Sequence, residues 1–156
     1  MHVLVAHASR HGSTTEVAAR IAERLRELGH DATLRTARDR APLDGHDLVV
    51  VGGSLYTGRW HADAQRFLRR HRGELGRVPV AVFAMGPRRD DPDAWTAARD
   101  QLESALAKLA WLDPAAIAVF GGKDPKPKHG VVRDLRDWAA VDAWAESMVG
   151  GGPATR

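Results

Sequence analysis

Two kinds of hydrophobic pattern alternate along the chain. In the first kind, apolar residues follow one another without interruption, which is typical of a parallel strand buried on both faces. One stretch instead alternates apolar with polar residues, which favours a strand at the edge of the sheet. These patterns predict five strands, of which the alternating one is the second. The expected strands are residues 3–8, 31–36, 47–53, 78–85 and 115–121.

In the second kind of pattern, apolar residues recur every three or four positions, which indicates a helix with one face toward a core. Local signals mark two helix ends: Gly29 follows the first helix, and Pro92 stands at the first position of the third. In the last helix, Trp138, Val141 and Trp144 are expected to face inward. The expected helices are residues 14–28, 62–71, 92–109 and 138–148.

Strands that alternate with helices predict an α/β domain with a parallel sheet. The 156 residues are long enough to enclose one hydrophobic core, and no boundary divides them. We therefore expect a single domain over residues 1–149, followed by a flexible glycine-rich tail at residues 150–156.

Composition narrows the possible functions. The chain has no cysteine, which excludes disulfides and thiol redox chemistry, and its eight histidines show no metal-ligand spacing, so no metal site is expected. No apolar run approaches the roughly 18–20 residues of a membrane-spanning helix. The N-terminus enters a strand pattern directly, without a signal peptide, so a cytoplasmic location is expected. The net charge of +3 comes without a basic stripe carrying interleaved aromatic residues, and nucleic-acid binding is not expected.

The loop after the first expected strand carries the clearest chemical signal. Short hydroxyl side chains surround a glycine just before a helix, and a helix N-terminus offers free amides and a positive dipole end to an anion. A helix cap alone would need only one hydroxyl, that of Ser13 or Thr14. The loop lacks the lysine of a P-loop and the glycine spacing of a dinucleotide fingerprint. The candidate phosphate-binding residues are Ser9, Arg10, His11, Gly12, Ser13 and Thr14.

This loop, read as Ser9-x-His11-Gly12-x-Thr14, resembles the phosphate signature of flavodoxins, with His11 in the place of the middle threonine. A second stretch, residues 52–61, is similar to the flavin loop of flavodoxin-domain proteins related to menaquinone-dependent protoporphyrinogen oxidase. The resemblance implies a flavodoxin-like three-layer sandwich, a five-stranded parallel sheet of order 2-1-3-4-5, and FMN as the cofactor.

Carried over by position, the resemblance implies two further groups of FMN-binding residues. Ser54, Leu55, Tyr56, Thr57 and Gly58 would run along the flavin ring, and Met85, Gly86 and Pro87 form the third loop on the flavin side. Two roles stay open for Tyr56, which either contacts the ring or shields the end of a strand. Trp60 likewise either shields the flavin or begins the packing of the next helix.

Two functions remain after this resemblance. The first is an FMN-dependent oxidoreductase that passes electrons between the flavin and a small organic substrate or quinone, with the flavin itself as the catalytic group. The second is a flavodoxin-type one-electron carrier that docks redox partners. The chain is basic where flavodoxins are usually acidic, and it lacks the long insert that protoporphyrinogen oxidases carry after the fifth strand. Substrate, electron donor and oligomeric state stay open, with a homodimer among the alternatives.

Overall fold

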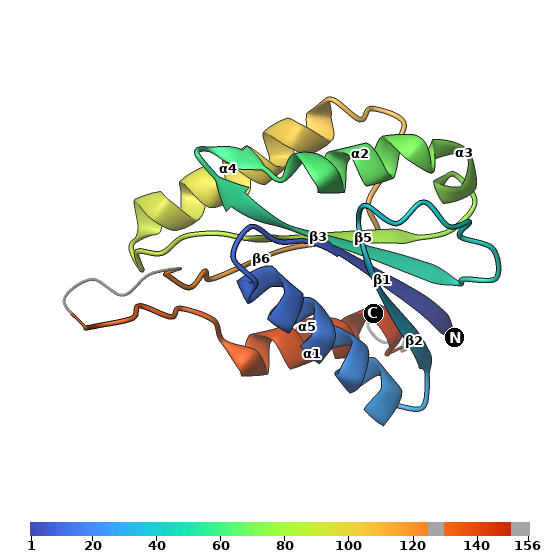
Figure 1. The fold of residues 1–156 in the computed structure, drawn as a ribbon, viewed down its shortest axis with the longest axis horizontal. Coiled ribbons are helices and arrows are strands. Elements are labelled where there is room, and N and C mark those ends of the chain that lie inside the picture. The colour runs from blue at the N-terminus through green and yellow to red at the C-terminus, as the bar shows by residue number, and fades with distance from the viewer. Residues whose placement is uncertain (125–129, 151–156) are drawn as a thin grey trace.

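The computed structural model describes residues 1–124 and 130–150, so most of the expected tail, residues 151–156, lies outside the described part. At its centre, five parallel strands lie in the order β2-β1-β3-β5-β6 (Figure 1). A two-residue strand, β4 (Arg59–Trp60), pairs antiparallel with the end of β3. Counted without β4, this is the expected order 2-1-3-4-5, and the fold prediction is confirmed. The long strands are β1 (His2–Ala8), β2 (Asp31–Thr36), β3 (Leu48–Tyr56), β5 (Val80–Met85) and β6 (Ala116–Phe120).

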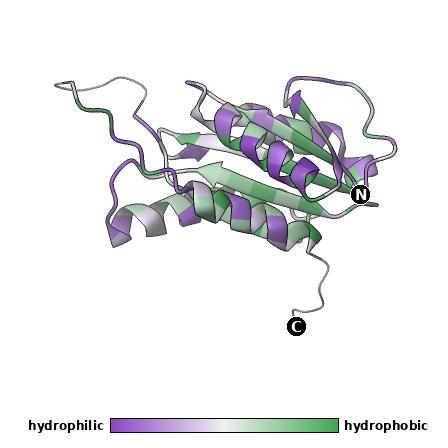
Figure 2. Cartoon of the chain, turned by 90° about the horizontal axis from the view of Figure 1, so that it is seen from below, coloured by the Kyte–Doolittle hydropathy of each residue, from purple (hydrophilic) through white to green (hydrophobic). Residues whose placement is uncertain are grey.

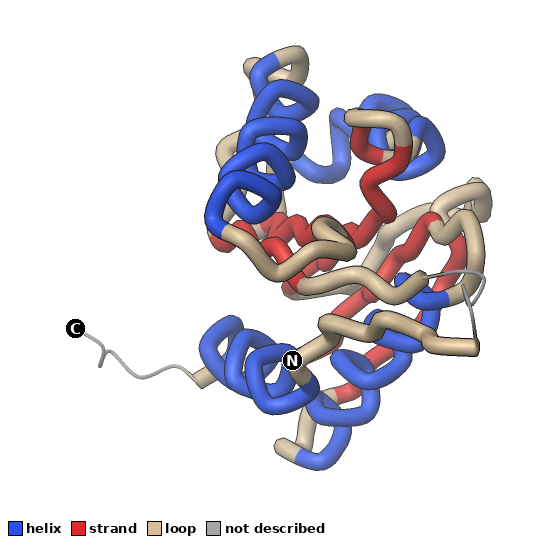
Figure 3. The backbone as a smooth tube through the Cα atoms, turned by 90° about the vertical axis from the view of Figure 1, so that its left-hand side faces the viewer, coloured by secondary structure: helices blue, strands red, loops and turns tan. Residues whose placement is uncertain are grey.

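Helices cover both faces of this sheet and make the molecule a three-layer sandwich (Figures 1 and 3). One face carries α1 and α5, and the other carries α2, α3 and α4. No described helix is long and apolar enough to cross a membrane. The helices are α1 (Ser13–Glu27), α2 (Ala62–Arg70), α3 (Arg72–Leu75), α4 (Pro92–Ala107) and α5 (Trp138–Val149).

Successive residues of each central strand belong to the two opposite cores. Leu4 and Ala6 of β1 pack on the side of α2 and α4, whereas Val3 and Val5 pack on the side of α1 and α5. All four are buried. Because neighbouring side chains of a strand point to opposite faces, a strand covered on both sides must be apolar throughout. Figure 2 shows this concentration of hydrophobic residues on the strands between the helices.

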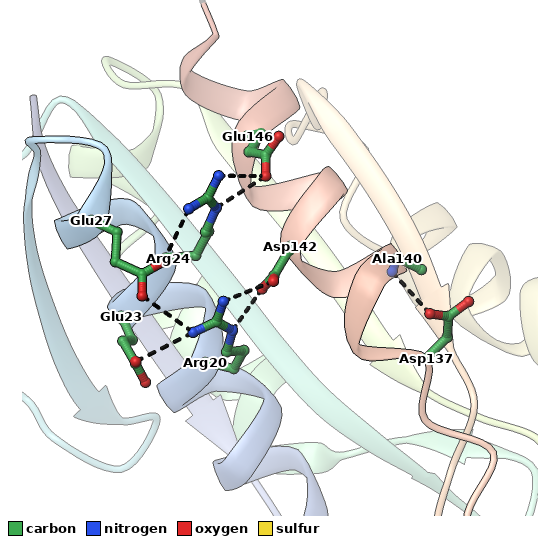
Figure 4. A network of polar contacts seen from close by, with 8 residues as sticks. All are labelled: Arg20, Glu23, Arg24, Glu27, Asp137, Ala140, Asp142 and Glu146. Atoms are coloured by element: carbon green, nitrogen blue, oxygen red, sulfur yellow. Dashed lines mark hydrogen bonds and ion pairs between the residues drawn. The ribbon is translucent and has the colours of Figure 1, made fainter.

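Ion pairs join α1 to α5 along the side of their apolar contact (Figure 4). Arg20 donates two hydrogen bonds to the carboxylate of Asp142, at 2.6 and 2.7 Å. One turn further along α1, Arg24 donates to Glu146 at 3.0 Å. Arg20 and Asp142 are each about three-quarters buried, and their bidentate geometry makes this pair stronger than an ordinary surface ion pair.

Two sequence expectations differ from the structure at helix ends. Trp138, which was expected to face the core, is 39% exposed, and the guanidinium of Arg136 lies 4.9 Å from the centre of its ring. It is the first residue of α5, which Asp137 caps, and the buried residues of this helix, Val141 and Ala145, lie further along it. Leu109 is buried as expected but lies beyond the end of α4 at Ala107.

Candidate functional site

The loops that follow β1, β3 and β5 meet at one edge of the sheet, because the carboxyl ends of parallel strands lie together. Ligands of open α/β sheets bind beyond this edge, near the point where the strand order reverses. Here the chain runs from β1 to β2 on one side and from β3 toward β5 on the other, so the strand order reverses between β1 and β3. Residues 9–14 follow β1 and therefore lie at this position.

The N-terminus of α1 is left without a capping side chain. The cap residue is Gly12, in the left-handed region at φ 92°, and no described side chain accepts a hydrogen bond from the first turn. Ser9 instead accepts a hydrogen bond from the Gly12 amide at 2.8 Å, which shapes the loop. Ser13 and Thr14 lie inside the helix, so the simple capping role for them is wrong. The first-turn amides are available to an anion.

Two buried hydroxyls in these loops have no hydrogen-bond partner among the described residues. Thr14 is fully buried in the first turn of α1 and leaves Oγ1 unpaired, and Ser54 near the end of β3 leaves Oγ unpaired. An unpaired buried polar group costs about 1–3 kcal/mol. Both hydroxyls belong to segments expected to bind FMN, so the residues present fit a ligand that supplies polar partners at the strand ends.

The segment after Ser54 is a β-hairpin and not the loop that the sequence predicts. Tyr56 pairs with Arg59 across a two-residue turn at Thr57 and Gly58. Both turn residues have positive φ, 49° and 78°, as in the type I′ turns that close tight hairpins. Tyr56 is 38% exposed, and the guanidinium carbon of Arg10 lies 4.0 Å from the centre of its ring.

Trp60 belongs to the core. It is 1% exposed, and its indole nitrogen donates to the backbone oxygens of Gly53 and Phe83, both at 3.2 Å. A Cβ added to Gly53 would approach the indole nitrogen to 2.8 Å, so glycine makes room for Trp60. Of the two roles open for Trp60, flavin shielding is therefore wrong and packing is confirmed.

The third predicted loop begins inside the sheet. Met85 is the last residue of β5 and is 3% exposed, and Pro87 is also buried. Between them, Gly86 donates to the backbone oxygen of Phe120 at 2.7 Å. A Cβ on Gly86 would lie 2.9 Å from that of Ala98 in α4, so the backbone here passes close to the helix.

A narrow crevice of about 30 Å³ brings the three segments together, and two adjoining hollows extend it. One hollow, of about 290 Å³, lies between α4 and the segment that follows β5, and Gly58 and Pro87 line it. The other, of about 180 Å³, lies at the start of α1 beside Gly12. Of the predicted residues, those that line the crevice are Arg10, His11, Ser13, Ser54, Leu55, Tyr56, Met85 and Gly86.

Two residues of this crevice, Gly122 and Lys123, were missed as site residues by sequence reasoning. Both follow β6, and Arg88, which follows Pro87, lines the crevice as well. Lys123 lines both the crevice and the hollow at the start of α1, which brings an ammonium group beside the phosphate-loop candidates His11 and Ser13. Their position after a strand end was the available signal, but the sequence around them has no distinctive motif.

Two histidines near the site have structural partners. His7 is 8% exposed, its Nδ1 lies 3.3 Å from Thr15 Oγ1, and burial lowers its pKa, so it stays neutral at pH 7. His61 accepts a hydrogen bond from the Asp63 amide at 3.0 Å and caps α2. Burial is the main cause that lowers the pKa of His61, and the cations of Arg10 and Arg66 add to this effect. Among the described residues, no group of three metal-ligating side chains is present.

The fold is that of a doubly wound α/β protein, and it places an uncapped helix N-terminus at the edge of the sheet where such proteins bind ligands. Residues 4–132 match the family model described as the flavodoxin domain, and the chain belongs to this family. Membership implies FMN as the cofactor and flavin-based redox chemistry, in agreement with the sequence prediction.

Sequence and structural similarity to individual proteins is consistent with membership of the flavodoxin family. The chain is 25% identical over 131 residues to the protoporphyrinogen IX dehydrogenase [quinone] of Escherichia coli K12, covering 83% of this chain and 72% of that protein. Oxidised flavodoxin 1 from Bacillus cereus superposes with a TM-score of 0.66 at 18% identity, covering 97% and 99% of the two chains. Rubredoxin oxygen:oxidoreductase from Desulfovibrio gigas gives 0.65 at 16% identity, and this chain spans 35% of its length.

Proposed function

We propose that this protein is an FMN-dependent oxidoreductase that exchanges electrons with a small organic substrate or a quinone. The proposal rests on the unpaired polar groups in the first turn of α1. Within the described part of the chain, its amides have no side-chain cap and the buried hydroxyl of Thr14 has no hydrogen-bond partner. Both features match a bound phosphate, which accepts several hydrogen bonds at once.

Each segment of the site has a role in this proposal. The loop of Ser9 to Thr14 would hold the FMN phosphate, with the ammonium of Lys123 adding a positive charge beside it. Leu55 and Tyr56 would contact the flavin ring, and the Thr57–Gly58 turn would lie at its edge. Bound FMN supplies the redox chemistry, and the protein positions it and controls access to it.

A titration with FMN tests the proposal directly. We expect the purified protein to bind one FMN, seen as a shifted flavin absorbance band near ~450 nm and quenched flavin fluorescence. Riboflavin, which lacks the phosphate, is the matched control ligand and should bind at least ten-fold more weakly, because charge-assisted hydrogen bonds contribute about 1.5–3 kcal/mol each. Absence of FMN binding would refute the proposal.

A one-electron carrier is the second candidate, and the overlap with a flavodoxin favours it. The Bacillus cereus flavodoxin and this chain cover each other almost completely. Reductive titration separates the two candidates. Direct two-electron reduction is expected for the oxidoreductase, whereas an accumulating one-electron form would favour the carrier.

A further inference from the structure

A cleft of about 600 Å³ lies between α2 and α4, with the β3–β4 hairpin at one end. It adjoins the candidate FMN site, because four of the residues expected there also line the cleft: Arg10, Tyr56, Thr57 and Gly58. Gln65, Arg66 and Arg69 line it from α2. Ser104 and Lys108 face it from the other side, at the C-terminal part of α4 and just after it. Residues 65 and 69 are four positions apart, as are residues 104 and 108, which is the spacing of side chains on one face of a helix.

Every charged side chain that lines this cleft is a cation. The set comprises Arg10, Arg59, Arg66, Arg69 and Lys108, with no aspartate or glutamate among the lining residues. The whole chain carries 23 basic and 20 acidic residues. With so balanced a composition, both acidic and basic side chains would be expected around an ordinary surface hollow. This cleft is lined by basic side chains without acidic ones, so positive charge is concentrated there.

Most of these cations have no carboxylate partner. Arg66 pairs with Asp63 at 3.2 Å, but none of the other four forms an ion pair with any carboxylate of residues 1–124 or 130–150. Elsewhere in the molecule many arginines are paired, as Arg20 and Arg24 are. Unpaired cations that converge from several elements repel one another, and an anion bound between them relieves that repulsion.

From these observations we propose that the cleft between α2 and α4 binds a small organic molecule carrying two or more phosphate or carboxylate groups. The volume falls within the roughly 300–1,000 Å³ of small-molecule sites, and its concave shape favours a small ligand over a flat protein surface. Arg69 and Lys108 on opposite walls would each hold one anionic group, and Arg59 would hold a group near the hairpin. Gln101 and Ser104 offer further hydrogen-bonding groups.

The cleft also adjoins the candidate FMN crevice through shared residues. Arg10 and Tyr56 line both, so the hairpin is the wall between them. A ligand anchored by its anionic groups in the cleft would lie next to the flavin. Binding of the anion is independent of FMN, whereas a role for this ligand as the redox substrate rests on the proposed function.

Calorimetric titration with pyrophosphate and with tricarballylate, at constant ionic strength, tests the cleft. The Gly12→Asp protein is titrated alongside the FMN-saturated protein, because its added carboxylate keeps anions out of the phosphate loop. We expect saturable one-to-one binding in both, and the tighter of the two ions identifies phosphate or carboxylate as the preferred group. Anion binding by an unaltered protein that takes up no FMN would support the cleft while refuting the proposed function.

A pair of double variants locates the binding. Arg69→Gln with Lys108→Gln removes two cleft cations and should weaken binding at least ten-fold. Arg40→Gln with Arg77→Gln removes two exposed arginines that do not line the cleft and should change the affinity less than about two-fold. Equal weakening by both pairs, or no saturable binding of either ion, would overturn the proposal. So would binding of polyglutamate alone, which would assign the surface to an acidic protein.

Discussion

The guanidinium carbon of Arg10 lies 4.0 Å from the centre of the Tyr56 ring. This cation–π contact joins the loop after β1 to the hairpin after β3, and it covers one face of the aromatic ring. The crevice beside it holds only about 30 Å³, too little for a flavin ring. A flavin ring could stack on this face of Tyr56 only if Arg10 moved away.

Replacing Tyr56 tests which of its two roles is correct. We expect Tyr56→Leu to weaken FMN binding about ten-fold, because stacking on an aromatic side chain contributes about 1–3 kcal/mol per base-sized ring. Tyr56→Phe keeps the ring and should stay within about two-fold of the unaltered protein. Equal FMN affinity in all three proteins, measured by fluorescence titration, would leave Tyr56 as a shield for the strand end.

Thr14→Val separates ligand binding from stability. Valine keeps the shape of the buried side chain and removes the unpaired hydroxyl, so the free energy of unfolding without FMN should stay equal or rise by about 1 kcal/mol. Affinity for FMN should fall about ten-fold, because the hydroxyl would donate to the phosphate. Denaturant unfolding and FMN titration measure the two effects, and riboflavin binding should be unchanged. A loss of stability without FMN would instead indicate a structural hydroxyl.

The turn at Thr57 offers a stabilising substitution. Thr57 is the one described non-glycine residue with positive φ, and a β-branched side chain tolerates that conformation poorly. Asparagine is enriched there, and Asn-Gly is a preferred sequence for this type of hairpin turn. We expect Thr57→Asn to raise the free energy of unfolding by about 0.5–1 kcal/mol. The matched change at the next position, Gly58→Ala, should lower it, since φ is 78°.

The pair of Arg20 and Asp142 makes stability depend on acid pH. Hydrogen bonds from Arg20 lower the pKa of Asp142, so the contribution of this pair is complete above the usual aspartate pKa of about 4 and is lost as the pH falls below it. Asp142→Asn should therefore destabilise the protein by about 1 kcal/mol at neutral pH and by less at about pH 3. Glu23→Gln, which changes a more exposed partner of Arg20, should have a smaller effect at either pH. Thermal melts across this pH range measure the difference.

Secondary structure and the uncapped start of α1 were predictable because their signals are local. The mostly apolar residues 47–53 favour a strand covered on both faces, and they form most of β3. Gly12 and its neighbouring hydroxyls precede a helical pattern directly, so sequence alone indicates an anion-binding helix end. The hairpin was missed because Arg59 and Trp60 form too short a strand to show an alternating pattern.

Sequence analysis predicts the five long strands, four of the five described helices and the loop that begins α1, because each depends on residues within one or two turns; the short helix α3 was missed. Which distant residues share a site depends instead on how the elements are arranged in three dimensions. Lys123 lies beside the phosphate loop, and the cations of Arg10, Arg59, Arg69 and Lys108 line one cleft. These residues become neighbours through the order of the strands and the packing of the helices, which follow from the burial of both faces of the sheet. Because these are long-range features, the spacing of residues along the sequence does not reveal them.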